Sequence, residues 1–182
     1  MTDGSILGFA LLGLLHGKPQ SGYDLRKVFA TTAMGSFSDS PGAIYPALAR
    51  LEKQGKIRGK VEESAGVRRK RTYLLTPKGK AAFRDWLAQP ITRDDIVHRI
   101  GELMLRFAFM GGIVEPRQIA RFLRDLEREI AAYIPTLEEF IATQRRQMSL
   151  SGRLALECGI QEYLARLEWA RSAAARFEKE EG

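Results

Sequence analysis

The chain has a single cysteine, two histidines and no uncharged stretch long enough to span a membrane. Cys158 has no partner for a disulfide within the chain, and it lies in an apolar helical pattern where we expect a buried thiol. The apolar run from Ile6 to Leu15 follows Asp3 rather than a basic residue and precedes no small-residue cleavage site, so it predicts a core helix and not a secretion signal. Arg106 interrupts the most apolar later segment. We therefore expect a protein of the reducing cytoplasm that does not enter a membrane.

The scarcity of histidine and cysteine also limits the chemistry that the chain can perform. His16 lies at the end of a predicted helix and His98 lies beside a predicted hinge, and neither belongs to a metalloprotease, nucleophile-elbow, phosphate-loop or paired-carboxylate motif. One cysteine and two separated histidines cannot build a tetrahedral zinc site within one chain. We therefore expect no enzyme activity, no metal and no cofactor.

Positive charge is concentrated in the first half of the chain. The 182 residues carry a net charge of +7, yet residues 1–90 contain 15 Lys and Arg against 7 Asp and Glu, a net charge of +8. Residues 91–182 contain 14 against 15, a net charge of −1. The excess in the first half indicates a polyanionic partner such as DNA, RNA or an acidic membrane, and charge alone does not choose among these.

The first half carries the signals of helices and of a β-hairpin. Ser21 is placed to cap a second helix, and Ser40 to cap a third, with Pro41 at its first position. Because Pro46 would remove a backbone hydrogen bond inside the third helix, we expect that helix to bend or to start late. The pattern predicts helices over 5–16, 21–31, 40–54 and 76–89, and strands over 57–63 and 69–75. This order predicts a winged helix-turn-helix domain over residues 1–90.

The third predicted helix has one apolar and one mixed face. Ile44, Leu48 and Leu51 fall on the apolar face, which we expect to be buried. The opposite face carries Ala43, Tyr45, Ala47, Arg50 and Lys53. Small side chains let a helix approach a groove, while an aromatic hydroxyl and cations can bind phosphates or base edges. The alternative is an ordinary amphipathic helix with a solvated basic face.

Residues 50–71 contain nine Lys and Arg against three acidic residues, so the charge surplus is local. The hairpin end is predicted to bind backbone phosphates or an adjacent minor groove through Arg68, Arg69, Lys70 and Arg71. Sequence choice is predicted to come from the major groove, through Tyr45 and the residues around it, Ser40, Gly42, Ala43, Pro46 and Arg50. Ser21 and Tyr23 could hold a phosphate at the start of the second helix. The alternatives are partly buried tyrosine rings and a solvated turn.

The second half, residues 91–182, is predicted to be entirely helical. Asp94 or Asp95 is placed to cap a helix that runs to Met110, and Pro116 opens a long segment with a kink expected at Pro135. Apolar residues at alternating spacings of three and four predict a dimerisation seam containing Leu123, Leu126, Ile130, Leu137, Leu156, Ile160 and Leu167. A hairpin of two such helices cannot bury both faces by itself, so we expect it to pack on a second copy. The alternative is that the seams fold back onto the first domain.

Aromatic residues in the second half offer flat apolar surfaces. We predict an effector site for a small aromatic compound at the dimer or interdomain junction, at Trp169, Phe107 and Tyr163, with Phe109, Phe177 and Trp86 of the first half as further candidates. The alternative is that these aromatic residues, at helical spacing, belong to the core.

Three segments resemble the PadR family of bacterial transcriptional regulators. They are GYDLRKVF at 22–29, SPGAIYPALARLEKQGKI at 40–57 and RKRTYLLTPKG at 69–79. The resemblance covers residues 5–88 by motif, and beyond them only the layout of long helices is similar. Phe37 stands where the family commonly has tryptophan.

The resemblance implies a homodimeric repressor that binds double-stranded DNA at an inverted repeat through its wing and recognition helix. It also implies a dimer held by the C-terminal helices and release from DNA by a small hydrophobic or phenolic compound. The fold class expected is mainly α with a small β-hairpin, in which a winged helix-turn-helix precedes a helical dimerisation region. The alternative function is a winged helix that binds another protein without sequence-specific DNA binding, and four adjacent cations at the wing argue against it.

Overall fold

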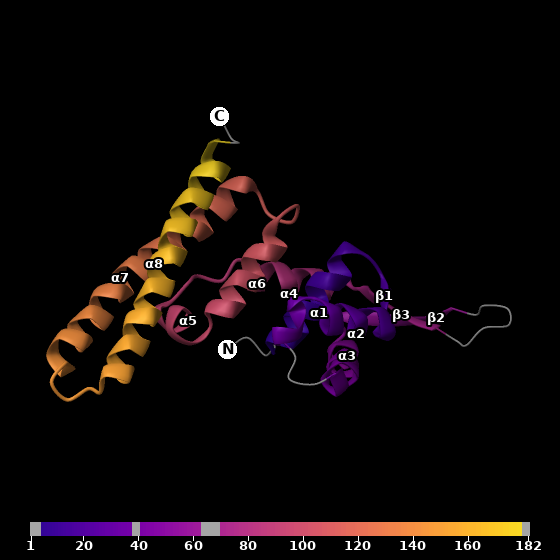
Figure 1. The fold of residues 1–182 in the computed structure, drawn as a ribbon. Coiled ribbons are helices and arrows are strands. Elements are labelled where there is room, and N and C mark those ends of the chain that lie inside the picture. The colour runs from indigo at the N-terminus through magenta and orange to yellow at the C-terminus, as the bar shows by residue number, and fades with distance from the viewer. Residues whose placement is uncertain (1–4, 38–40, 63–69, 180–182) are drawn as a thin grey trace. The chain divides into compact units, whose positions relative to one another are not determined.

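The computed structural model describes residues 5–37, 41–62 and 70–179 (Figure 1). The chain divides into two compact units, Met1–Gln89 and Pro90–Gly182, which we call the N-terminal and the C-terminal unit. The N-terminal unit combines helices with a small sheet, and the described part of the C-terminal unit is helical. The mainly α fold class expected from the sequence is therefore confirmed.

The N-terminal unit contains the predicted helices and hairpin in the predicted order. Its elements are α1 (Ile6–Gly17), β1 (Gln20–Ser21), α2 (Gly22–Thr31), the 3-10 turns η1 (Ala33–Phe37) and η2 (Pro41–Ala43), α3 (Ile44–Lys53), β2 (Ile57–Glu62), β3 (Lys70–Leu75) and α4 (Pro77–Leu87). The antiparallel sheet has the strand order β1-β3-β2, with Gln20 opposite Tyr73 and Ile57 opposite Leu75. Strand β1 was not predicted, because two residues are too few to show an alternating pattern.

Side-chain caps explain where the helices of this unit begin. The Ser21 hydroxyl accepts the backbone N–H of Asp24, and the Asp24 carboxylate accepts the backbone N–H of Ser21, so the two residues form a capping box at the start of α2. The Thr76 hydroxyl accepts the backbone N–H of Gly79 at 3.0 Å, with Pro77 at the first position of α4. Both predicted helix starts are thus confirmed.

The third helix starts late, as expected from Pro46. Ser40 lies outside the described residues, and Pro41 opens the 3-10 turn η2 instead of the α-helix. The α-helix begins at Ile44, so Pro46 falls in its first turn, where a backbone N–H has no partner within the helix. The missing donor of Pro46 therefore costs the helix nothing.

The core of the N-terminal unit is built on a stack of aromatic rings from α1 and α4. The ring centroids of Phe9 and Trp86 lie 4.7 Å apart with an angle of 3° between the planes, and Phe83 lies 5.7 Å from Trp86. The predicted apolar face of α3 is buried in this core, since Ile44, Leu48 and Leu51 are all shielded from solvent. Ala47 was expected on the open face and is buried instead, because it packs toward α1.

The C-terminal unit contains α5 (Arg93–His98), α6 (Ile100–Met110), α7 (Pro116–Gln144) and α8 (Leu150–Lys179). One helix was expected where α5 and α6 stand, with a cap at Asp94 or Asp95. The cap is Thr92, whose hydroxyl accepts the backbone N–H of Asp95 while the Asp95 carboxylate accepts the backbone N–H of Thr92 at 2.8 Å. Arg99 leaves the helical conformation and separates the two helices.

Helices α7 and α8 lie side by side as a long hairpin (Figure 1). Ion pairs join them at the surface, with Arg124 Nη2 at 2.7 Å from Glu178 Oε2 and Arg171 Nε at 2.8 Å from Glu127 Oε1. Helix α7 continues through Pro135. No helix in the described ranges is long and apolar enough to cross a membrane.

The predicted dimerisation seam is largely occupied within one chain. Leu123, Leu126 and Ile130 of α7 are fully buried, and so, almost completely, are Ile160 and Leu167 of α8. Leu137 and Leu156 are partly buried. The heptad spacing identified the apolar stripes correctly, but a single chain already covers most of them. Cys158, expected to be buried, is exposed because it lies on the open face of α8.

Candidate nucleic-acid interface

Two exposed tyrosines mark the corner where α2 and α3 meet. Tyr23 is 63% exposed at the start of α2, and Tyr45 is 49% exposed in the first turn of α3. The Tyr45 ring lies against Gly22, where an added Cβ would stand 2.7 Å from Tyr45 Cε1. Gly22 therefore permits a close approach between the two helices of a helix-turn-helix and holds Tyr45 at its edge.

The other predicted contacts of this corner differ in accessibility. Gly42 and Pro46 are exposed, and Ala43 is half-buried. Ser21 is buried, and its hydroxyl donates to Asp24 Oδ2 at 2.7 Å, so the structure gives this side chain a capping role. The guanidinium of Arg26 lies 5.9 Å from the centroid of the Tyr23 ring and adds a cation beside it.

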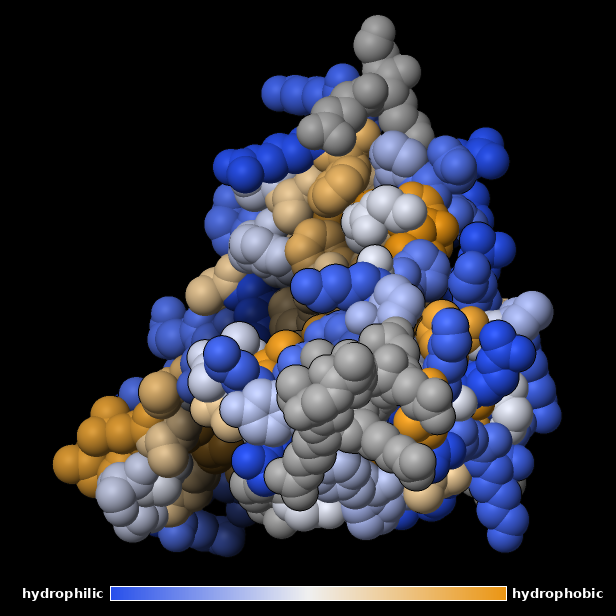
Figure 2. Space-filling model, turned by 90° about the vertical axis from the view of Figure 1, so that its right-hand side faces the viewer, coloured by the Kyte–Doolittle hydropathy of each residue, from blue (hydrophilic) through white to orange (hydrophobic). Residues whose placement is uncertain are grey.

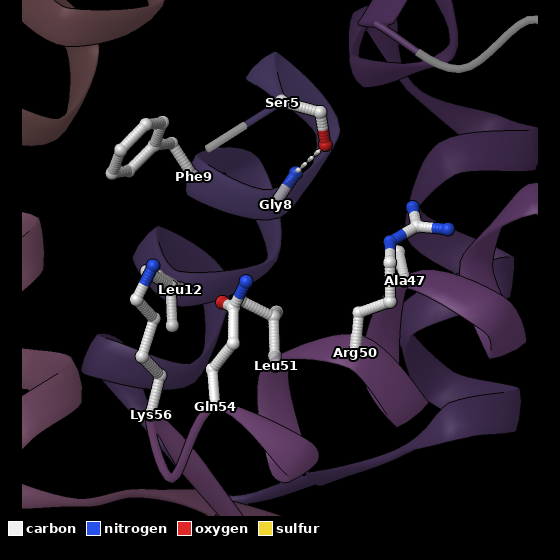
Figure 3. Close-up of a pocket in the computed structure, with 9 residues that line it drawn as sticks. All are labelled: Ser5, Gly8, Phe9, Leu12, Ala47, Arg50, Leu51, Gln54 and Lys56. Carbon is white, nitrogen blue, oxygen red and sulfur yellow. Dashed lines mark hydrogen bonds between the residues drawn. The ribbon is translucent and has the colours of Figure 1, made fainter. Parts of the chain in front are cut away.

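Arg50 extends from the last turn of α3 at the rim of a hollow between α1 and α3 (Figure 3). The hollow is small, with a volume of about 40 Å³, and its lining includes the apolar side chains of Leu12 and Leu51. Figure 3 shows the side chains of Gln54 and Lys56 extending toward the helix that carries Gly8, while the Arg50 guanidinium points away from that helix. Arg50 is exposed and forms no ion pair with a side chain that the structure describes, so its guanidinium is available to an anion.

The β2–β3 hairpin presents further cations. Arg58 and Lys60 of β2 are exposed, and among the described side chains neither has an ion-pair partner. Figure 2 views the molecule from the side toward which β2 and β3 extend in Figure 1, and hydrophilic side chains cover much of the face that it shows. Arg68 and Arg69 lie outside the described residues, and of Lys70 only the backbone is described, as the first residue of β3.

Arg71, predicted as a phosphate contact, has a partner within the chain. Its Nη2 donates to both carboxylate oxygens of Glu52, at 2.8 and 2.7 Å. Glu52 Oε1 also accepts the backbone N–H of Gly59 at 2.8 Å. The Gly59 N–H and, to a smaller extent, Arg71 hold the pKa of Glu52 below its ordinary value. Sequence reasoning missed this cluster, because its members are separated along the chain and belong to three elements.

Two of the three predicted effector residues meet in the C-terminal unit. The rings of Phe107 and Trp169 pack edge to face with centroids 5.2 Å apart, and Phe177 packs on Phe107 in the same way at 6.3 Å. These rings and Arg176 line a hollow of about 340 Å³. Trp86, the other tryptophan, belongs to the core of the N-terminal unit.

Tyr163 lies apart from this hollow. Its ring packs edge to face on Tyr133 at 5.2 Å, its hydroxyl donates to the carbonyl oxygen of Ile96 at 3.2 Å, and burial raises its pKa. Tyr163 and Trp169 are six residues apart on α8, and at about 100° per residue they point about 120° away from each other. The helical spacing itself was thus the signal that these two side chains belong to different sites.

Helices α2 and α3 followed by an antiparallel hairpin define the N-terminal unit as a winged helix-turn-helix. Residues 11–85 match the Transcriptional regulator PadR-like family, and the chain therefore carries a PadR-like domain, as its motifs indicated. The negative transcriptional regulator PadR of Bacillus subtilis (strain 168) is 35% identical over 88 residues, which cover 47% of this chain and 48% of that protein. The chain thus matches about half the length of this curated relative.

Two solved structures match over most of their length. The PadR-like transcriptional regulator BC1756 from Bacillus cereus is 28% identical with a TM-score of 0.42, covering 96% of this chain and 99% of that one. Bacillus subtilis PadR in complex with operator DNA is 27% identical with a TM-score of 0.43, covering 94% of this chain and 97% of that one. Both TM-scores lie below 0.5.

Proposed function

We propose that this protein is a sequence-specific DNA-binding transcriptional regulator that acts as a homodimeric repressor on an inverted repeat. The observation that carries the proposal is the exposed corner of Tyr23, Tyr45 and Arg50 on a winged helix-turn-helix with an exposed cationic strand. The PadR-like domain over residues 11–85 and the 35% identity to a negative transcriptional regulator support it. The localisation that follows from this function is the cytoplasm.

The proposed roles follow from accessibility. Tyr45 reads base edges in the major groove, where the small neighbours Gly42 and Ala43 let the backbone approach. Arg50 and the hydroxyl of Tyr23 bind phosphates beside it. Further phosphate contacts come from the cations of the hairpin, Arg58, Lys60, Arg68, Arg69 and Lys70. Ser40 stays a predicted contact beside Tyr45 in the major groove.

The proposed dimer interface consists of apolar side chains that are exposed in a single chain. Leu150, Leu154 and Leu164 of α8 are exposed, and so is Phe140 near the end of α7. A two-fold interface presents the same patch from each copy, so one exposed apolar row is enough to build it. A two-fold dimer places two recognition helices on half-sites one DNA turn apart, about 10 base pairs from centre to centre or a multiple of this.

Footprinting on the DNA upstream of the gene that encodes this protein tests the proposal. We expect protection of two related half-sites with the spacing of a DNA turn or a multiple of it. Even protection of every sequence would reduce the function to non-specific DNA binding. Absence of protection on any DNA would favour the protein-binding alternative.

A second proposal concerns an effector for the hollow of the C-terminal unit. Phe107, Trp169 and Phe177 offer aromatic walls to a planar ring. Arg176 has no ion-pair partner among the described side chains and could bind a carboxylate of the ligand. We propose that this hollow takes a small aromatic acid, such as a phenolic acid, and that Tyr163 has no part in it.

Titration of the protein with 4-hydroxybenzoate, followed by tryptophan fluorescence, tests the effector site. We expect a saturable change that is absent in Trp169→Ala. Arg176→Gln should weaken binding roughly tenfold, because a hydrogen bond to a charged group is worth about 1.5–3 kcal/mol. The neutral 4-hydroxybenzamide has the same ring without the charge and serves as the matched ligand. Lack of any saturable change, or equal affinity of both ligands, would count against this site.

A further inference from the structure

The carboxylate of Glu52 on α3, the proposed recognition helix, binds both strands of the β2–β3 hairpin, which forms the wing. Glu52 belongs to α3, Gly59 to β2 and Arg71 to β3. Glu52 Oε1 accepts the Gly59 backbone N–H at 2.8 Å and Arg71 Nη2 at 2.8 Å, and Oε2 accepts Arg71 Nη2 at 2.7 Å. The segment that we propose to enter the major groove is thus connected directly to the wing.

The environment of Arg71 fixes where its guanidinium points. The guanidinium carbon lies 5.6 Å from the centroid of the Tyr73 ring, next along the same face of β3. An added Cβ on Gly59 would clash with Arg71 Nε and would stand 2.9 Å from Glu52 Oε1. The ion pair therefore closes over Gly59, and Arg71 turns back toward α3.

Folding stability does not explain the presence of the Glu52–Arg71 ion pair. The side chains of Glu52 and Arg71 are 30% and 52% exposed, and ion pairs this accessible to solvent typically contribute little to folding stability. A carboxylate among the nine Lys and Arg of residues 50–71 also repels DNA phosphates. Removal of the Glu52 carboxylate should therefore strengthen DNA binding, unless this carboxylate holds the hairpin in the orientation that binds DNA.

We propose that Glu52 is a positioning residue for DNA binding, which sets the direction of the wing relative to the recognition helix through Arg71 and the Gly59 backbone. In this role Arg71 binds Glu52 instead of a phosphate. The proposal rests on the proposed DNA-binding function, and it differs from the phosphate-contact role predicted for Arg71 from the sequence.

The test compares Glu52→Gln with Asp85→Asn, which removes the same charge from an exposed position on α4. Binding of the full-length protein to its operator is measured by fluorescence anisotropy, and the unfolding midpoint by circular dichroism. We expect Asp85→Asn to bind as well as the wild type or better. Glu52→Gln should bind about five- to tenfold more weakly, the size of a typical coupling between contacting residues, with a nearly unchanged midpoint. Tighter binding by both variants would overturn the proposal.

The salt dependence of Arg71→Gln separates positioning from phosphate contact. If Arg71 contacts a phosphate, the slope of log Kd against log salt falls by about one in Arg71→Gln and not in Glu52→Gln, whereas loss of the positioning pair changes the slope equally in both variants. We also expect Glu52→Gln/Arg71→Gln to bind no more weakly than either single variant. A slope that falls in Arg71→Gln alone, or independent losses that multiply in the double variant, would refute the positioning role. If the wild type shows no operator preference, the proposed function itself fails. That result is distinct from the two outcomes that would refute the positioning role.

Discussion

Replacement of Tyr45 by alanine should remove most of the preference of this protein for its operator. The Tyr45 side chain is half-exposed in the first turn of α3, and the close contact with Gly22 limits the positions that its ring can take. A side chain that reads base edges is worth about 1–3 kcal/mol of discrimination, roughly 5- to 150-fold in affinity. We therefore expect a loss of this size on operator DNA and a much smaller loss on a shuffled sequence.

Two variants serve as controls for Tyr45→Ala. Tyr23→Ala removes a more exposed ring from the start of α2, where we expect contact with phosphate, so it should weaken binding to both DNAs by a similar factor. Tyr45→Phe keeps the ring and removes the hydroxyl, which separates hydrogen bonding from packing. Equal losses of Tyr45→Ala on operator and shuffled DNA would show that Tyr45 takes no part in sequence recognition.

Replacement of Trp86 by alanine should destabilise the N-terminal unit by about 3–5 kcal/mol, the usual cost of truncating a buried aromatic side chain. Trp86 is 1% exposed and stacks on Phe9 of α1 and on Phe83 of its own helix. Domains of ordinary stability unfold with about 5–15 kcal/mol, so this loss is a large fraction of the total. Because α1 also packs against α3, DNA binding should fall as well.

The other tryptophan provides the matched control for Trp86→Ala. Trp169 is 38% exposed in the C-terminal unit, so Trp169→Ala should change the free energy of unfolding much less. Both variants are measured by urea denaturation, followed by far-ultraviolet circular dichroism. An unchanged transition in Trp86→Ala would contradict the view that the aromatic stack holds the N-terminal unit together.

Local chemistry made much of the N-terminal unit predictable from the sequence. Ser21 and Thr76-Pro77 mark helix starts because side-chain oxygens accept hydrogen bonds from free backbone N–H groups. Pro46 delays the start of α3 because proline has no backbone N–H to donate within a helix. These signals lie within a few residues of their effects. Thr92 was missed as a cap because Asp94 and Asp95 offer similar oxygens one turn along, and only the geometry selects among them.

Features that depend on distant parts of the chain were not predictable in the same way. The spacing of Leu123, Leu126 and Ile130 identifies an apolar stripe, but the same spacing suits a partner helix from one chain or from a second copy. Ala47 is small enough to fit on either the buried or the exposed face of α3, so its burial could not be predicted from its residue type. The contact between Glu52 and Arg71 joins residues 19 positions apart, and neither charge alone identifies its partner.

The most direct test of sequence-specific regulation is a fluorescence anisotropy titration of the purified protein, over a series of salt concentrations, on its own upstream DNA and on a shuffled copy. We expect steep salt dependence on both DNAs, since bound phosphates release counterions, together with tighter binding to the upstream DNA by at least about 1,000-fold. Weak and equal binding to both at every salt concentration would contradict the proposed function.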